Sequence, residues 1–170
     1  VVAVGRIKSP EMADRLLKED RADVVAMGRS LIADPMLPQK AQAGQLNTIR
    51  PCIGCCLGCI HAVLALEPGG CVVNPDVGRE YLMDADEKAP AAKRVLVVGA
   101  GPAGMAASRL AAMRGHTVTL VEEKGHVGGV LRLAARVPGR GEIMDIINFL
   151  NLEIEHLGIA RRLNTPLDDV

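Results

Sequence analysis

Aromatic residues are nearly missing from this chain, which has one Tyr, one Phe and no Trp among 170 residues. Proteins that bind single-stranded nucleic acid need aromatic rings on which bases stack, so the composition argues against that class. An excess of charge is also missing, because 20 Lys and Arg balance 20 Asp and Glu. A neutral chain gives no electrostatic reason to expect nucleic acid or an anionic membrane surface as partner.

Long apolar runs and a secretion signal are lacking as well. No run approaches the roughly 20 apolar residues that a membrane-spanning helix needs, and no basic and apolar leader with a cleavage site opens the chain. The five cysteines lie between Cys52 and Cys71, and such clustering of an odd number is not a disulfide framework. We therefore expect a cytoplasmic protein with no membrane and no nucleic-acid partner.

The order of apolar segments predicts an α/β fold in several parts. Residues 1–47 alternate strand and helix, residues 48–75 carry the cysteines, residues 76–93 read as a charged linker, and residues 94–170 form a second α/β segment. The chain lacks an initial Met and opens on an apolar strand, so we expect the first segment to be the end of a larger domain.

The first segment predicts two parallel strands, Val1–Gly5 and Asp23–Met27, that a larger domain would bury on both faces. Without their neighbours, these two strands are expected to expose edges and apolar faces. A helix is expected to begin at Ser9 or Pro10, and another after Asp34-Pro35. In the last segment the apolar pattern predicts strands at 95–98 and 117–121 and helices at 102–115 and 142–156.

The cysteine spacing Cys-x2-Cys-x3-Cys-x11-Cys predicts a metal centre. It places Cys52, Cys55, Cys59 and Cys71 on one tight loop and its return. Soft thiolates suit iron–sulfur clusters or zinc, and glycines in the loop make a sharp turn easy.

We rank an iron–sulfur cluster first, zinc second and unligated redox thiols third. Structural zinc sites usually have two short cysteine pairs, which is not this pattern. Cys56 is the spare thiol; it also makes a Cys-x2-Cys pair with Cys59, so a swapped ligand set stays open beside the simpler interpretation of a small buried residue.

The segment GAGPAG matches the dinucleotide-binding pattern G-x-G-x-x-G at Gly99, Gly101 and Gly104. It follows an apolar strand and opens a helix, and an acidic residue, Glu122, follows at the distance where ribose hydroxyls are bound. A carboxylate there would repel a 2′-phosphate. The alternative is a glycine-rich turn in an ordinary strand–helix–strand unit. Gly128-Gly129 is either a second close approach to the same ligand or a plain turn.

Two Gly-Arg steps, Gly5-Arg6 and Gly28-Arg29, follow the two strands of the first segment. In parallel barrels this strand end carries the ligand site, often for a phosphate. Backbone N–H groups and arginine donors would suit the phosphate of FMN. A surface arginine after a strand is the alternative, and on spacing alone it is the commoner situation.

Taken in order, VAVGRI, DVVAMGRSLIADP, RPCIGCCLGC, CVVNP, VLVVGAGPAGMAA and EEKGHVGG resemble the bacterial 2,4-dienoyl-CoA reductase and trimethylamine dehydrogenase family, which is Old Yellow Enzyme-like. The resemblance implies the end of an FMN-binding TIM barrel, a 4Fe–4S cluster and the start of a Rossmann-like FAD/NAD(P)-binding domain. It implies that the two Gly-Arg steps hold the FMN phosphate and that the four spaced cysteines are the cluster ligands. FAD, or ADP at the same site, would contact Ala103, Glu122, Gly129, Val130 and Arg140.

The same resemblance implies an enzyme that passes electrons from NAD(P)H through FAD and the cluster to FMN, where an activated C=C bond of a small-molecule substrate is reduced. Outward flow from an amine substrate is the alternative within the family. A non-catalytic zinc module and an electron-transfer subunit serving another chain are hypotheses of other classes. The barrel strands that carry the family's catalytic residues are absent here, so we expect no turnover from these 170 residues alone. Substrate, NADH or NADPH preference and oligomeric state stay open.

Overall fold

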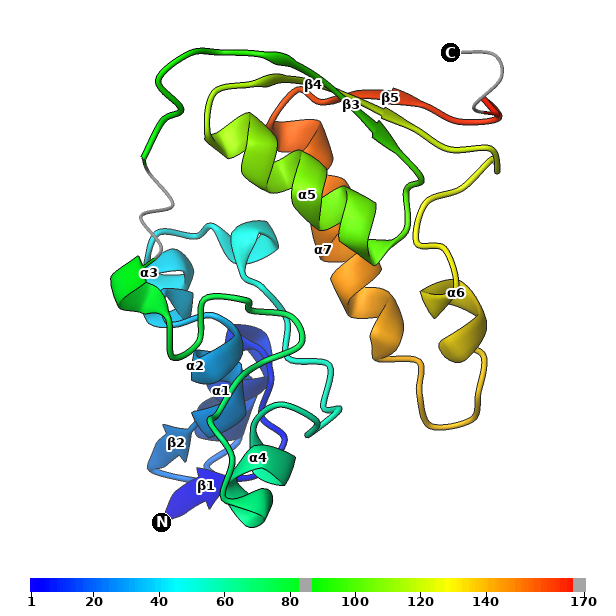
Figure 1. Ribbon diagram of the computed structural model, residues 1–170. Coiled ribbons are helices and arrows are strands. Elements are labelled where there is room, and N and C mark those ends of the chain that lie inside the picture. Colours follow the sequence, from blue (N-terminus) through cyan, green and yellow to red (C-terminus); the bar gives the residue numbers. More distant parts are fainter. Residues whose placement is uncertain (83–86, 167–170) are drawn as a thin grey trace. The chain divides into compact units, whose positions relative to one another are not determined.

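A computed structural model describes residues 1–82 and 87–166 (Figure 1). The chain divides into two units, Val1–Met83 and Asp84–Val170, each of which is described by itself. Both units are mixed α/β structures with parallel strands. The division falls within the predicted linker 76–93, of which residues 83–86 lie outside the described part.

The first unit begins with a strand–helix–strand element. Strands β1 (Val2–Val4) and β2 (Val24–Ala26) pair in parallel, with Val2 opposite Val24, and helix α1 (Pro10–Lys18) connects them. The Ser9 hydroxyl oxygen accepts the Met12 N–H at 3.2 Å, which satisfies an otherwise unpaired donor of the first turn. The predicted start of this helix is confirmed.

These two strands expose apolar side chains, as is expected of strands without their neighbours. Val2, Val4 and Val24 are 59%, 76% and 55% exposed. A sheet of two strands leaves both of its edges unpaired and its apolar faces open to further strands and helices. Buried apolar residues in this unit are Ile7, Ala22, Ala33, Leu37, Ala62 and Val73.

Short helices make up the rest of the first unit. Helix α2 (Gly28–Ala33) begins at the second Gly-Arg step, which therefore forms the first turn of a helix. Helix α3 (Leu37–Gln42) and the 3₁₀ turn η1 (Leu46–Thr48) precede the cysteines. Helix α4 (Ile60–Ala65) and the 3₁₀ turn η2 (Glu80–Leu82) were not expected, since neither is long enough to show a period.

The second unit is built on one parallel sheet of order β3-β4-β5, from strands β3 (Arg94–Val98), β4 (Thr117–Val121) and β5 (Ala160–Arg162). Helices α5 (Pro102–Met113) and α7 (Ile143–His156) lie together on one face of this sheet (Figure 1). Helix α6 (Leu131–Ala134) is a single turn. The core of the second unit includes Met105, Leu120, Ile147 and Ile154, each at most 2% exposed.

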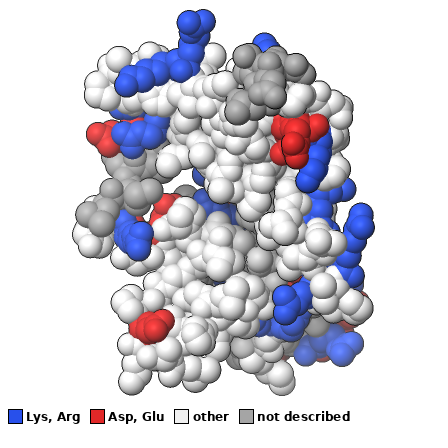
Figure 2. Space-filling model, turned by 45° about the vertical axis from the view of Figure 1, so that its right-hand side comes forward, with Lys and Arg blue, Asp and Glu red and all other residues white. Residues whose placement is uncertain are grey.

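Figure 2 shows Lys and Arg side chains dispersed among wide uncharged areas on the face that it draws. Within the described residues, no helix combines the length and apolar character needed to cross a membrane.

Candidate cofactor sites

The five cysteines of the first unit line one pocket. Cys52, Cys55, Cys59 and Cys71, which were predicted as cluster ligands, are joined there by Cys56. All five thiols are free. The structure thus brings together thiols that the sequence spreads over a loop and its return.

Glycines shape this pocket in two different ways. Gly54 has φ +65°, a left-handed conformation that lets the loop turn between the first two cysteines. Gly58 has a different role, because a Cβ there would lie 2.7 Å from the Gly70 carbonyl oxygen. The Gly70 N–H donates to the Gly58 carbonyl at 2.7 Å, so the segment carrying Cys71 lies directly against the loop.

A single zinc ion and an iron–sulfur cluster place different demands on the cysteine thiols. A tetrahedral zinc needs its sulfur ligands about 2.3 Å from one point. In residues 1–82 and 87–166, no group of three or more His, Cys, Asp or Glu side chains is placed to hold a metal ion. An iron–sulfur cluster differs in this respect, because each thiolate binds its own iron and the sulfurs stand further apart.

Arg29 is the cation beside these thiols. Its Nη1 donates to Cys56 Sγ at 3.0 Å. Burial raises the pKa of the Cys52 thiol, while a backbone hydrogen bond from Gly54 and the charge of Arg29 act in the opposite direction. The cysteine pocket is therefore partly desolvated, with one positive charge at its wall.

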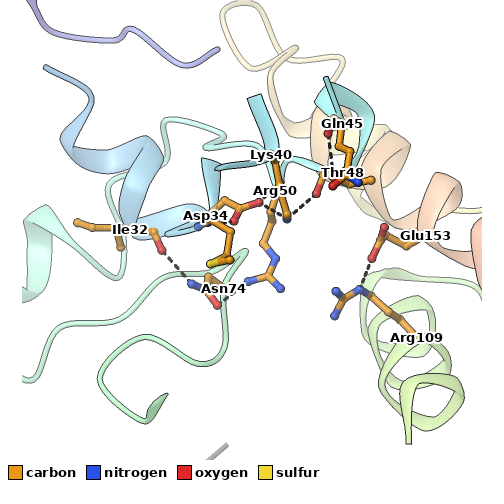
Figure 3. Close-up of polar contacts among 10 residues, drawn as sticks. Ile32, Asp34, Lys40, Gln45, Thr48, Arg50, Asn74, Arg109 and Glu153 are labelled. Carbon is orange, nitrogen blue, oxygen red and sulfur yellow. Dashed lines mark hydrogen bonds and ion pairs between the residues drawn. The ribbon is translucent and has the colours of Figure 1, made fainter. Parts of the chain in front are cut away.

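A polar network that the sequence did not reveal holds the segment that precedes Cys52. Asp34, only 4% exposed, accepts hydrogen bonds from Lys40 Nζ at 2.6 Å, the Met36 N–H at 3.0 Å and the Arg50 N–H at 2.8 Å. Lys40 also donates to the Thr48 carbonyl at 2.7 Å (Figure 3). A buried carboxylate with three donors is well satisfied, and it ties the segment before Cys52 to the end of α2.

The segment after the cysteines is held by Asn74. Its Nδ2 donates to the Ile32 carbonyl at 2.9 Å, and its Oδ1 accepts a hydrogen bond from Arg50 Nη1 (Figure 3). Arg50 precedes Cys52 by two positions and Asn74 follows Cys71 by three. One side chain thus joins both ends of the cysteine segment to helix α2. An Asn directly before Pro75 was the only signal in the sequence, and it is a weak one.

Replacing Asn74 with Ala is expected to destabilise the cysteine segment. The change removes the hydrogen bonds that Asn74 makes with the Ile32 carbonyl and the Arg50 guanidinium, and such a loss typically lowers the unfolding free energy by about 1–3 kcal/mol. Urea unfolding and the rate of metal loss to a chelator would measure it. Asn47→Ala, at an exposed position, is the matched control, and equal effects from both variants would contradict the role given to Asn74.

The two predicted Gly-Arg steps line one cavity of about 200 Å³ in the first unit. Gly5, Arg6, Gly28 and Arg29 share its wall with Cys52. Gly5 has φ +110°, which a residue with a side chain rarely adopts. A Cβ at Gly5 or Gly28 would meet nothing within 4 Å, so bare backbone faces open space at both steps. This space and its two arginines fit a phosphate-bearing ligand such as FMN.

The glycine-rich loop of the second unit has the conformation that its pattern predicts. Gly99, with φ +94°, makes the turn after β3, and Gly101 is the N-cap of α5 with no side chain over the helix end. A Cβ on Gly104 would lie 2.0 Å from the Gly99 carbonyl oxygen, so only glycine allows helix and strand this close. A Cβ on Gly101 would meet nothing within 4 Å, which leaves room for a pyrophosphate at the N-terminus of α5.

Glu122 lies beneath this loop and is 8% exposed. Its Oε2 accepts the Ala100 N–H at 2.8 Å, and its Oε1 accepts the Lys124 N–H at 3.0 Å. Each carboxylate oxygen has a second lone pair, so these bonds leave Glu122 able to accept ribose hydroxyls as the sequence predicts.

The Gly128-Gly129 pair also lies against the loop. The Gly128 N–H donates to the Ala100 carbonyl at 2.7 Å, and a Cβ on Gly129 would lie 3.1 Å from the Gly101 Cα. The pair therefore packs against the glycine-rich loop, and a close approach of Gly129 to the ligand itself stays a prediction. Ala103 and Val130 are exposed close to these glycines in the chain, and Arg140 lies in the exposed loop between α6 and α7. A ligand contact by these three stays a prediction.

Two segments of the chain match known protein families. Residues 1–48 match the NADH:flavin oxidoreductase / NADH oxidase family, and residues 94–153 match the FAD dependent oxidoreductase family. A relative, the NADH oxidase of Thermoanaerobacter brockii, is 45% identical over 99% of this chain and 26% of its own length.

Two solved structures are similar along almost the whole chain. A 2-naphthoyl-CoA reductase in complex with 2-naphthoyl-CoA has a TM-score of 0.89 at 38% identity, over 96% of this chain and 25% of that one. Histamine dehydrogenase from Rhizobium sp. 4-9 has a TM-score of 0.92 at 31% identity, over 99% of this chain and 25% of that one. The chain spans about a quarter of the length of the relatives that it matches. The resemblance recognised in the sequence is confirmed.

Proposed function

We propose that this chain is part of a multi-cofactor flavin oxidoreductase. It matches the NADH:flavin oxidoreductase / NADH oxidase family over residues 1–48 and the FAD dependent oxidoreductase family over residues 94–153, which supports the proposal. Electrons would pass from NAD(P)H through FAD and a 4Fe–4S cluster to FMN and reduce an activated C=C bond of the enoate or dienoyl-CoA type. Residues 1–47 would be the end of an FMN-binding TIM barrel, residues 48–75 the cluster segment and residues 94–170 the start of a Rossmann-like FAD/NAD(P)-binding domain.

One observation carries this proposal: the cysteine pocket and the Gly-Arg cavity share a wall. Cys52 and Arg29 line both. A one-electron centre held by the cysteines would therefore lie next to a flavin phosphate held by the arginines. Such adjacency has no purpose in a structural zinc module, where the metal only holds the chain together.

The residues of the first unit would bind and orient the two groups. Cys52, Cys55, Cys59 and Cys71 would each supply one thiolate, and the cluster would supply one-electron transfer between two-electron donors and acceptors. The Gly5 and Gly28 backbones would approach the flavin phosphate, with Arg6 and Arg29 as charged donors.

The second unit would bind the adenosine part of FAD. The N-terminus of α5 would face the pyrophosphate, and Glu122 would accept ribose hydroxyls. A buried carboxylate at this position would repel a 2′-phosphate, which supports FAD or ADP at this site. NADPH, which carries that phosphate, would need a different site.

An amine dehydrogenase with outward electron flow is the second candidate. The likeness to histamine dehydrogenase favours it, as the likeness to 2-naphthoyl-CoA reductase favours the reductive direction. The residues described here serve both, because cluster and flavin binding are the same for either direction.

A reductive titration decides between the directions. In the anaerobically purified protein that contains this chain, NADH or NADPH should bleach the flavin absorbance, and cinnamate or an enoyl-CoA thioester should restore it. Bleaching by dimethylamine or histamine without nicotinamide would instead establish the amine dehydrogenase. A protein with zinc and no flavin would contradict both.

A further inference from the structure

Arg29 occupies an unusual position, because it belongs to two sites at once. Its side chain lines the Gly-Arg cavity together with Arg6, and it also lines the cysteine pocket, which Arg6 does not. The hydrogen bond from Nη1 to Cys56 Sγ, 3.0 Å long, fixes the guanidinium between the two. The spare cysteine thus acts as the acceptor that positions Arg29.

The single positive charge of Arg29 lies beside both sites, the cavity that would hold a phosphate and the pocket that would hold the cluster. The guanidinium's fork of five N–H donors can serve a phosphate and a thiol together, which a lysine ammonium cannot do with the same geometry. A positive charge beside the cysteine pocket favours the more negative, reduced form of a cluster. A phosphate in the cavity offsets that same charge.

We propose that Arg29 couples the two sites electrostatically, so that a phosphate group bound in the Gly-Arg cavity lowers the reduction potential of the cluster held in the cysteine pocket. The inference rests on the proposed function and adds a regulation to it. Because coupling between sites is reciprocal, reduction of the cluster weakens phosphate binding by the same factor.

The coupling has a direction that suits electron transfer. When the cavity is empty, the cluster is easier to reduce and holds its electron. When the flavin phosphate is in place, the added electron is less stabilised on the cluster and passes on more readily. Arg29 would thereby favour onward transfer only when the acceptor is bound.

The test is a redox titration of the flavin-free, cluster-loaded protein, followed by the electron paramagnetic resonance signal of the reduced cluster. Saturating inorganic phosphate is expected to lower the ratio of reduced to oxidised cluster about tenfold at a fixed potential, which is about 59 mV for a one-electron couple. FMN should act like phosphate, and riboflavin, which lacks the phosphate, should leave the potential unchanged.

Two arginine variants separate the coupling from simple phosphate binding. In Arg29→Gln the reduction potential of the cluster without phosphate should already be lower by about 59 mV, and added phosphate should no longer shift it. Arg6→Gln is the matched control: it should weaken phosphate binding but leave the phosphate-free potential as in the unchanged protein.

A potential that does not respond to saturating phosphate in the unchanged protein would overturn the coupling and leave the proposed function intact. Equal shifts in both arginine variants would overturn the special role of Arg29. A protein without iron would overturn the proposed function and the coupling with it. The phosphate titration needs no variant, so poor folding of Arg29→Gln would not prevent the decision.

Discussion

Changing any one of Cys52, Cys55, Cys59 or Cys71 to Ser is expected to abolish the cluster, whereas Cys56→Ser should leave it in place. The four residues supply one thiolate each from the wall of one pocket. A serine oxygen is a hard ligand that is poorly matched to iron–sulfur chemistry, and three remaining thiolates leave one iron uncoordinated. Iron and acid-labile sulfide analysis should give about four of each per chain in the unchanged protein and a large loss in the four variants.

Cys56→Ser is the internal control for this series. Its Sγ accepts a hydrogen bond from Arg29 and lies 3.6 Å from the Gly54 carbonyl oxygen, so it has partners of its own inside the protein. Serine preserves a small polar acceptor at a backbone position with φ +58°. Loss of iron in Cys56→Ser, with retention in Cys55→Ser, would mean that the ligand set is swapped.

Zinc is the outcome that would change the interpretation most. One zinc and no sulfide per chain would indicate a structural metal, and the electron route through this segment would have to be abandoned. The measurement is most informative on anaerobically purified protein, because oxygen damages exposed clusters, and Cys55 is an exposed residue.

Features that depend on neighbouring residues, such as the glycine-rich loop, could be predicted from the sequence. The roles of Gly99 and Gly104 follow from a strand, a turn and a helix within a few residues. The N-cap Ser9 could be found for the same reason. In both cases the residues that interact lie within a few positions of one another, so a short sequence pattern records the whole interaction.

Contacts between distant segments could not be predicted. Asn74 bonds to Ile32, which lies 42 residues away, and Arg29 bonds to Cys56, which lies 27 residues away. No periodicity or spacing records which of many polar side chains will meet across such distances. The exposure of Val2 and Val4, by contrast, could be expected, because two strands without neighbouring strands leave their edges and apolar faces uncovered.

Two alanine substitutions in the glycine-rich loop should separate ligand binding from folding. Gly101→Ala places its methyl in open space, at a residue whose φ of −71° suits alanine. The unfolding free energy should then change by less than about 0.5 kcal/mol. Binding of FAD or ADP should weaken about 100-fold, because the methyl takes the place where backbone must approach the pyrophosphate. Isothermal titration with ADP and denaturant unfolding would measure the two effects.

Gly104→Ala should lower stability more than it weakens ADP binding. Its Cβ would lie 2.0 Å from the Gly99 carbonyl oxygen and 3.4 Å from Val97 Cγ1, and the nearer atom is backbone that cannot rotate away. Helix α5 must shift off the sheet, and overpacking of this kind lowers the unfolding free energy by about 1–3 kcal/mol or more. ADP binding should weaken only through that shift. Similar stability losses in the two variants would show that the loop glycines serve packing alone, and the dinucleotide site would then lose its main structural support.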